Sequence, residues 1–262
     1  MDASKMRDVV GAGHTRNFSE SDIAAFFDAL RDRGSIERMF DFLPDVSFYI
    51  KDRQCRWMAC NTRAVQSLNF RDRVEILGAT EFDFFPRQIA EKIYNDDQRV
   101  MATGERLLNR IEVILDQSGH LAWVATNKVP LFDRTGTVIG LMGITRVVST
   151  SSELPAGFRS FQAAITYIQE HLHEEIRMDD LAALSNLSTS QFRKRFRSLF
   201  HLSPREFVLR TRLQTAARRL SMTRDPIIYV ALDSGFSSQS YFTAQFRAFF
   251  GTSPNKFRRS LS

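Results

Sequence analysis

The stretch LAALSNLSTSQFRKRFRSLFHLSPREF (residues 181–207) returns in altered form as VALDSGFSSQSYFTAQFRAFFGTSPNKF (residues 230–257). Both copies carry three phenylalanines spaced four residues apart, followed by a Ser-Pro pair. The matching residues are Phe192, Phe196, Phe200, Ser203 and Pro204 in the first copy, and Phe242, Phe246, Phe250, Ser253 and Pro254 in the second. The chain therefore contains an internal duplication, and both copies predict the same local structure.

Each copy predicts a short helix, a tight turn and a second helix. Asn186 and Gly235 are residue types that readily adopt the left-handed backbone at a helix end. The second helix begins at a capping box, Ser188 to Gln191, in the first copy and at serine 237 or 238 in the second. The phenylalanines then form one buried face. The duplication therefore predicts two helix-turn-helix units.

One helix is predicted to join the two units. Its apolar residues recur at helical spacing from about Pro204 to Leu220, with Ser203 as N-cap and proline at the first helical position. Such a helix is roughly 25 Å long at 1.5 Å per residue. It can hold two recognition helices near successive major-groove segments, which lie about 34 Å apart.

Positive charge gathers in the same part of the chain. The whole sequence has 36 basic and 30 acidic side chains and a pI of about 9.6. Residues 181–262 contain 14 basic and 3 acidic side chains, a surplus of +11, whereas residues 1–156 carry −2. A basic domain of this kind is typical of a polyanion partner, although a solvated arginine-rich surface is the alternative.

The helix faces opposite the phenylalanines carry the candidate DNA-binding side chains. Arginine and lysine suit guanine or phosphate, and glutamine suits adenine. The candidates are Ser190, Arg193, Lys194 and Arg197 in the first unit, and Gln239, Ser240, Tyr241, Thr243 and Arg247 in the second. A merely solvated polar face is the competing interpretation.

Residues 158–262 resemble the DNA-binding domain of the AraC family of bacterial transcription regulators. The duplicated unit, the long middle helix and the stretch GFSSQSYFTAQFRAFFGTSPNKFRR carry the resemblance. It implies base contacts by Ser190, Arg193 and Lys194, and by Gln239, Ser240, Thr243 and Tyr241. Arg197 and Arg247 are expected to contact phosphates or to pack. Position 244 is alanine here but often basic in relatives, so weaker readout is expected from the second unit.

Residues 36–148 predict an antiparallel sheet with helices on one face, an α+β fold that precedes the all-α domain. Expected strands lie at 46–51, 56–60, 107–115, 120–129 and 138–147, and expected helices at 61–68, 74–77 and 86–103. Residues 149–157, STSSELPAG, read as a linker. This part of the chain resembles a PAS sensor domain through LPDVSFYIKDRQCRWMACN, GATEFDFFP and GTVIGLMGITRVV. The resemblance implies a ligand cavity and pairing with a second copy.

Five residues are candidate ligand contacts in such a cavity. Strand alternation places Trp123 and Asn127 inward and Lys128 opposite them, and Phe82, Phe85 and Tyr94 join from the helical side. A packed aromatic core is the alternative. The cofactor is unknown, and we expect no metal, haem or flavin-thiol chemistry. Two cysteines and five histidines are too few for a zinc site, GATEFDFF has no cysteine, and residues 87–103 have no histidine.

Residues 1–35 read as a polar segment followed by an amphipathic helix over about 21–33, which would cap the sheet or pair two subunits. With no signal peptide and no long apolar run, we expect a cytoplasmic protein without membrane contact. The expected partners are double-stranded DNA, a second copy of the chain, a small molecule in the PAS domain and, as a further candidate, RNA polymerase.

The leading hypothesis is a sequence-specific transcription regulator whose PAS domain senses a small ligand or controls dimer geometry. The alternative is a PAS interaction module whose DNA binding depends on a protein partner. An enzyme is not expected, because the sequence has no paired carboxylates in a motif, no phosphate-binding loop and no triad at a recognisable spacing.

Overall fold

The computed structural model describes residues 38–116 and 118–260. The amphipathic helix predicted over about 21–33 lies outside them. Within the described part, no helix combines the length and apolar character that crossing a membrane requires.

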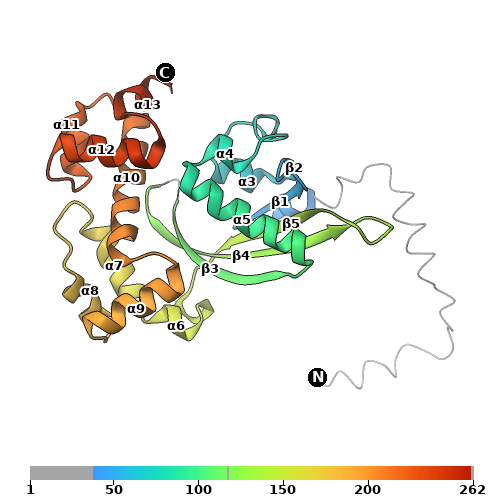
Figure 1. Cartoon of the computed structure of the whole chain (residues 1–262), viewed down its shortest axis with the longest axis horizontal. Helices are drawn as coiled ribbons and strands as arrows, with labels where there is room; N and C mark the ends of the chain where they lie inside the picture. Colours follow the sequence, from blue (N-terminus) through green and yellow to red (C-terminus); the bar gives the residue numbers. More distant parts are fainter. Residues whose placement is uncertain (1–37, 117, 261–262) are drawn as a thin grey trace. The chain divides into compact units, whose positions relative to one another are not determined.

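The first half of the described chain forms a five-stranded antiparallel sheet (Figure 1). Its spatial order is β2-β1-β5-β4-β3, so the last strand lies between the first and the fourth. The strands are β1 (Val46–Asp52), β2 (Trp57–Cys60), β3 (Leu107–Leu115), β4 (Leu121–Phe132) and β5 (Val138–Val147). In register, Tyr49 of β1 lies opposite Gly143 of β5, and Lys128 of β4 lies opposite the same glycine.

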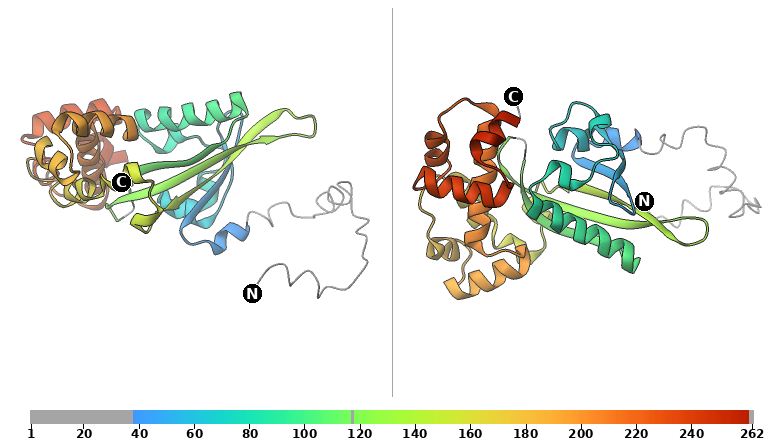
Figure 2. Two further views of the ribbon diagram at one scale, coloured as in Figure 1. Left: turned by 90° about the horizontal axis from the view of Figure 1, so that it is seen from below. Right: turned by 45° about the horizontal axis from the view of Figure 1, so that its top comes forward.

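Helices cover one face of this sheet, as Figure 2 shows for α5. They are α3 (Thr62–Ser67), α4 (Glu81–Phe84) and α5 (Arg87–Thr103), with short 3-10 turns at Met39–Phe42 and Arg73–Glu75. The predicted α+β fold is therefore confirmed. The apolar core between the helices and the sheet includes Tyr49, Trp57, Ile76, Val100 and Leu141.

Two differences from the sequence prediction have physical reasons. The prediction ended the fourth strand at residue 129, whereas β4 continues through Pro130 to Phe132. Pro130 lies opposite Leu141 of β5 and beyond Lys128, the last residue of β4 that pairs with β3, and a proline is tolerated where one side of a strand has no partner. The prediction also omitted α4, a single turn whose capping box joins Thr80 and Asp83.

The second half is entirely helical. Its elements are η3 (Ser151–Glu153), α6 (Ala156–Arg159), α7 (Gln162–Glu170), α8 (Met178–Leu184), α9 (Thr189–Phe200), α10 (Pro204–Met222), α11 (Ile227–Asp233), α12 (Gln239–Phe250) and α13 (Pro254–Ser260). Helices α8 and α9 form one helix-turn-helix unit, and α11 and α12 form the other, with α9 and α12 near opposite ends of α10 (Figure 1).

Each unit has its own aromatic core, and α10 contributes to both. Phe207 of α10 packs in the first core with Phe192 and Phe196. Leu213 and Leu220, further along α10, pack in the second core around the phenylalanines of α12. The two recognition helices are thus held by one continuous helix of 19 residues.

The turns form as the sequence predicts. Asn186 and Gly235 both have left-handed backbone, with φ of 53° and 83°. A Cβ at Gly235 would lie 2.3 Å from the carbonyl oxygen of Leu172, so a side chain cannot be accommodated there. The guanidinium of Arg212 fills the space beside Gly235, and its Nε donates a hydrogen bond to the carbonyl oxygen of Leu172 at 2.8 Å.

Candidate nucleic-acid interface

The N-terminus of α9 is fixed by a reciprocal pair of hydrogen bonds. Ser188 Oγ accepts from the backbone N–H of Gln191 at 3.3 Å, and the Gln191 side chain accepts from the N–H of Ser188 at 3.2 Å. Phe192, Phe196 and Phe200 then turn one face of α9 into the core. Because the phenylalanines fix the rotation of the helix, the opposite face must lie at the surface.

That face of α9 gathers the side chains predicted for the first unit. Ser190, Arg193, Lys194 and Arg197 are all exposed, and together with Thr189 they line one surface hollow. Three cations around a shallow concavity form a site suited to a phosphate or to the acceptor edge of guanine.

Thr189 is the member of this group that the sequence prediction omitted. It lies four residues before Arg193 on the same face of α9, and that spacing was the available signal. Its Oγ1 donates a hydrogen bond to Asp179 Oδ1 of α8 at 2.5 Å, which ties the start of the recognition helix to the preceding helix. Thr189 therefore orients α9 as well as lining the hollow.

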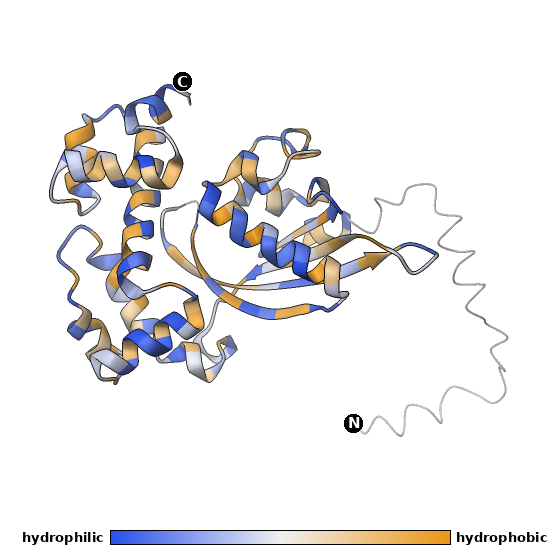
Figure 3. Ribbon diagram, in the orientation of Figure 1, coloured by the Kyte–Doolittle hydropathy of each residue, from blue (hydrophilic) through white to orange (hydrophobic). Residues whose placement is uncertain are grey.

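The second unit presents fewer charges. Gln239, Ser240, Tyr241 and Arg247 are exposed on α12, whereas Thr243 is half-buried. Ser238 Oγ accepts from the backbone N–H of Tyr241 at 3.2 Å and so caps the helix. Of the nine predicted DNA contacts, the structure thus leaves eight exposed and one partly covered. In Figure 3, α9 and α12 both mix hydrophilic and hydrophobic residues along their length.

A second candidate site is a cavity lined mainly by the sheet domain, with further lining residues from α10, among them Phe207 and Arg210. Tyr49, Lys51 and Trp57 line it from β1 and β2, and Glu81 and Phe85 line it from the helical side. On β4 the lining residues include Val124, Thr126 and Lys128. The lining thus combines aromatic rings with many acidic and basic side chains.

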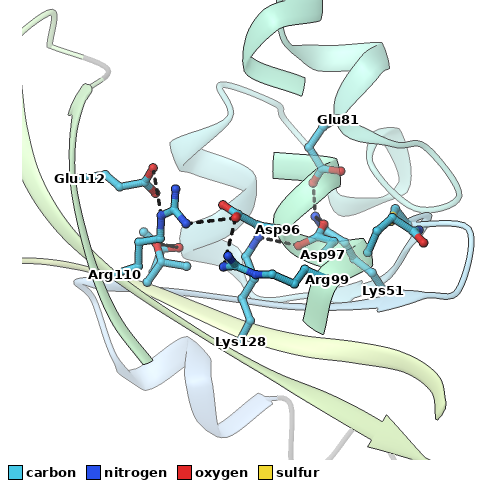
Figure 4. A network of polar contacts seen from close by, with 12 residues as sticks. Lys51, Glu81, Asp96, Asp97, Arg99, Arg110, Glu112 and Lys128 are labelled. Carbon is cyan, nitrogen blue, oxygen red and sulfur yellow. Dashed lines mark hydrogen bonds and ion pairs between the residues drawn. The ribbon is translucent and has the colours of Figure 1, made fainter. Parts of the chain in front are cut away.

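Four charged side chains at this cavity form the buried ion cluster: Lys51, Glu81, Asp97 and Lys128 (Figure 4). Asp97 is fully buried and pairs with Lys51 at 2.7 Å and with Lys128 at 2.5 Å. Glu81 pairs with Lys51 and accepts a hydrogen bond from the indole N–H of Trp57 at 2.9 Å. Two cations and two anions balance, which is how charges persist away from water.

The aromatic neighbours complete the surroundings of Lys51. Its Nζ lies 5.0 Å from the ring centroid of Tyr49 and 5.3 Å from that of Trp57, within cation-π range. Burial raises the pKa of the Tyr49 phenol well above its usual value, and the negative charges of Asp97 and Glu81 raise it further. Tyr49 is therefore a neutral phenol at physiological pH.

A second polar group lies further along the cavity (Figure 4). Asp96 pairs with Arg110 at 3.0 Å, and Glu112 pairs with Lys92. Burial opposes ionisation of Glu112, but the charges of Lys92 and Arg110 outweigh it and the pKa of Glu112 is lowered. Both walls of the cavity thus combine carboxylates with cations.

The inward direction predicted for β4 is wrong. Of the five predicted ligand contacts, Phe85 is the one among the cavity-lining residues. Asn127 instead accepts a hydrogen bond from the backbone N–H of Asn109 at 2.8 Å, where β3 bulges, and Trp123 contacts Phe158 on the other face of the sheet. The prediction placed Lys128 on the outer face, opposite Trp123 and Asn127, whereas in the structure Lys128 is buried and pairs with Asp97.

Phe82 and Tyr94 also lie away from the cavity lining. Phe82 is 46% exposed and its ring meets that of Tyr94 edge-on at 5.7 Å. The sequence reasoning missed Lys51, Glu81 and Asp97. The available signal was Lys51, which lies two residues after the inward-facing Tyr49 and therefore on the same face of β1. Lys128 lies on the same face of the sheet in β4.

Comparison with known proteins matches both halves of the chain. Residues 181–260 match the family described as a helix-turn-helix domain, and residues 40–153 match the PAS fold. The probable transcriptional regulator LumQ of Photobacterium leiognathi is 37% identical over 92 residues, which are 35% of this chain and 37% of LumQ. The regulatory protein SoxS of Salmonella typhimurium is 33% identical over 100 residues, 38% of this chain and 94% of SoxS.

A solved AraC-type transcriptional regulator from Chromobacterium violaceum is 25% identical, with a TM-score of 0.38, over 39% of this chain and 92% of that one. The chain spans little more than a third of the length of LumQ. The match to SoxS covers almost all of that protein at 33% identity. The chain therefore belongs to the AraC family of transcription regulators, and it joins the helix-turn-helix domain of that family to a PAS-fold domain.

Proposed function

We propose that the chain is a sequence-specific DNA-binding regulator that acts as a homodimer in the cytoplasm and whose PAS domain senses a small molecule. The observation that carries the proposal is the exposed face of α9, where Arg193, Lys194 and Arg197 line one hollow. Its counterpart on α12 is held by buried Phe242, Phe246 and Phe249, with Phe250 partly buried beside them. Two such faces on one chain suit a ligand with a repeating groove.

Each predicted contact has a role in this proposal. Ser190, Arg193 and Lys194 would meet base edges in one major-groove segment, and the polar side chains of α12 would read the next. Arg197 and Arg247 lie in the last turns of their helices and would grip phosphates. The lower charge of α12 fits a unit that contributes specificity with less electrostatic affinity.

The length of α10 supports simultaneous binding of both units. Its 19 residues span about 28 Å at 1.5 Å per residue. Successive segments of the major groove on one side of a duplex are about 34 Å apart. Recognition helices packed near the two ends of α10 can therefore enter adjacent segments.

Two arginines of α9 provide a matched test. Arg193 lines the hollow, whereas Arg195, also exposed, lies two residues further on and does not line it. Arg193→Ala should weaken binding of the selected DNA site by about 1–3 kcal/mol, roughly 5- to 150-fold, while Arg195→Ala changes it little. Fluorescence anisotropy with labelled duplexes measures both.

The same assay separates base reading from phosphate binding. If Arg193 reads a base, its replacement affects the selected site far more than random duplex DNA. Equal losses on both duplexes would reject the base-reading role, and equal effects of the two arginines would reject the proposed binding face. Strict dependence of DNA binding on an added protein partner would instead favour a PAS interaction module.

A further inference from the structure

The two halves of the helical domain, each built around its own aromatic core, touch each other beside α10. Leu172 follows α7 and packs against the first core, whereas Gly235 forms the turn of the second unit and precedes Phe236 of the second core. The carbonyl oxygen of Leu172 lies so close to Gly235 that a Cβ there would approach it to 2.3 Å. Backbone of one half therefore lies directly against backbone of the other.

Arg212 of α10 contacts both halves at this point. Its Nε donates a hydrogen bond to the carbonyl oxygen of Leu172 at 2.8 Å, and a terminal nitrogen donates to the carbonyl oxygen of Glu174 at 2.5 Å. The same guanidinium lies beside Gly235, where a Cβ would be 2.7 Å from Nε and 2.9 Å from Cζ. We call Leu172, Glu174, Arg212 and Gly235 the unit junction.

The chemistry of arginine suits this junction. A guanidinium presents its N–H donors in a rigid planar fork, so one side chain can hold two acceptors in a fixed geometry. Arg212 is half-buried, which limits the competition of water for these hydrogen bonds. Apolar burial is non-directional, whereas hydrogen bonds fix both distance and angle. The unit junction therefore adds a directional constraint to the packing of the two cores.

The turn at Gly235 is connected to α12 through the next residue. Phe236 is buried, and its ring centroid lies 5.0 Å from that of Phe242 and 6.1 Å from that of Tyr241. Both partners belong to the first turn of α12. The place of the turn thus fixes the place of the N-terminal end of the second recognition helix.

We propose that Arg212 is a positioning residue, which locks α12 at a fixed place relative to α9 and so sets the distance between the two sequence blocks that one chain reads. This role rests on the proposed function, in which the two helices bind adjacent groove segments. Linked binding elements reinforce each other only when their geometry lets both bind at once. One inserted base pair moves the second block by about 3.4 Å and turns it by about 34° around the duplex. Locked helices should therefore accept a single spacing.

Fluorescence anisotropy with the full-length protein measures the lock as a spacing ratio. This is the affinity for a duplex with the selected two-block site, divided by the affinity for the same site with one base pair inserted between the blocks. The unaltered protein should give a ratio of about ten or more, and Arg212→Met, which keeps an apolar stem but loses every donor, about three or less. Arg212→Lys should be intermediate, because an ammonium keeps the charge without the fork.

Arg219→Met is the matched control, the same change seven residues further along α10. Arg219 pairs with Asp225 at 3.0 Å and with Asp233 at 2.6 Å, and both aspartates belong to the second half. Arg219→Met should therefore lower stability and leave the spacing ratio unchanged. Equal ratios in Arg212→Met and the unaltered protein would overturn the proposal, as would equal losses of the ratio in the two variants or no spacing preference in the unaltered protein.

A distance measurement without DNA separates the lock from the proposed function. Spin labels are attached at Ser198→Cys on α9 and Ala248→Cys on α12, two exposed positions outside the predicted DNA contacts. Alanine replaces Cys55 and Cys60 in this background. Pulsed electron spin resonance should give one narrow distance distribution, which broadens in Arg212→Met, or in Arg212→Lys if the methionine variant fails to fold. Equal widths would overturn the proposal, whereas the expected widths without any DNA binding would reject the proposed function alone.

Discussion

Two carboxylates of α5 form ion pairs of the same length in opposite surroundings. Asp97 lies 2.7 Å from Lys51, with side chains 0% and 1% exposed. Glu91 lies 2.7 Å from Arg87, with side chains 47% and 83% exposed. If burial makes the ion cluster a structural element of the PAS domain, Asp97→Asn and Glu91→Gln must have very different effects on stability.

The expected magnitudes follow from the partners left behind. In Asp97→Asn, the ammonium group of Lys51 keeps its ion pair with Glu81, whereas that of Lys128 loses its ion pair with Asp97. Removing one partner from a buried pair costs about 3–5 kcal/mol, because the other charge stays desolvated. Breaking an exposed pair costs about 0–1 kcal/mol. The free energies of unfolding of the two variants should therefore differ by roughly 3 kcal/mol.

Urea titration followed by tryptophan fluorescence measures this difference. The chain has two tryptophans, so a Trp123→Phe background leaves Trp57, which lies in the core next to the cluster, as the reporter. Adding Lys128→Met to Asp97→Asn removes the excess charge and should recover part of the loss. Unfolding free energies of the two single variants within about 0.5 kcal/mol of each other would refute the reasoning.

Three further predictions concern single positions. Burial raises the pKa of Cys55 to about 11, so little thiolate exists at pH 8. Iodoacetamide should therefore label Cys55 slowly at pH 8 and faster as the pH approaches 11, and rapid labelling of Cys55 in the folded protein at pH 8 would contradict this. A Cβ at Gly143 would lie 2.5 Å from the ring of Tyr49, so Gly143→Ala should lower the free energy of unfolding by about 1–3 kcal/mol in urea titrations. Gly157→Ala, where the new Cβ makes ordinary contacts, should change it little, and equal losses in the two variants would contradict the packing of Gly143 against Tyr49. Ser188→Ala removes the cap of α9 and should cost about 1 kcal/mol of stability, a loss that Ser188→Thr should largely avoid.

The helical half was predictable because the duplication displays one pattern twice. Asn186 and Gly235 differ in type, yet both supply the left-handed residue that ends a helix, and both adopt it. The serine caps and the phenylalanine spacing fix the start and the rotation of each recognition helix. These are local signals, and so the exposed faces of α9 and α12 could be assigned from the sequence.

The order of strands and helices in the PAS domain was also predictable, but the interior of its cavity was not. The alternation along β4 correctly divides its residues between two faces of the sheet. The face that carries Lys128 was taken as the outer one, but Lys128 is buried beside Asp97, 31 positions earlier in the chain. Lys51 and Asp97 are likewise 46 positions apart. Pairing between distant charged residues has no local signature, and only the fold brings the partners together.

The short helix α4 was missed for a related reason. It contains four residues, too few to show a helical repeat, and its position depends on a capping box and on the contact of Glu81 with Trp57. The buried carboxylate of Glu81 therefore lies in the element that sequence periodicity was least able to detect.

We propose that both helix-turn-helix units of one chain read DNA together. Selection from a pool of random duplexes with the full-length protein, followed by sequencing, tests it most directly. We predict an enriched motif of two sequence blocks whose centres lie about 10 base pairs apart, one for α9 and one for α12. A motif with a single block, or no enrichment from a folded sample, would contradict it.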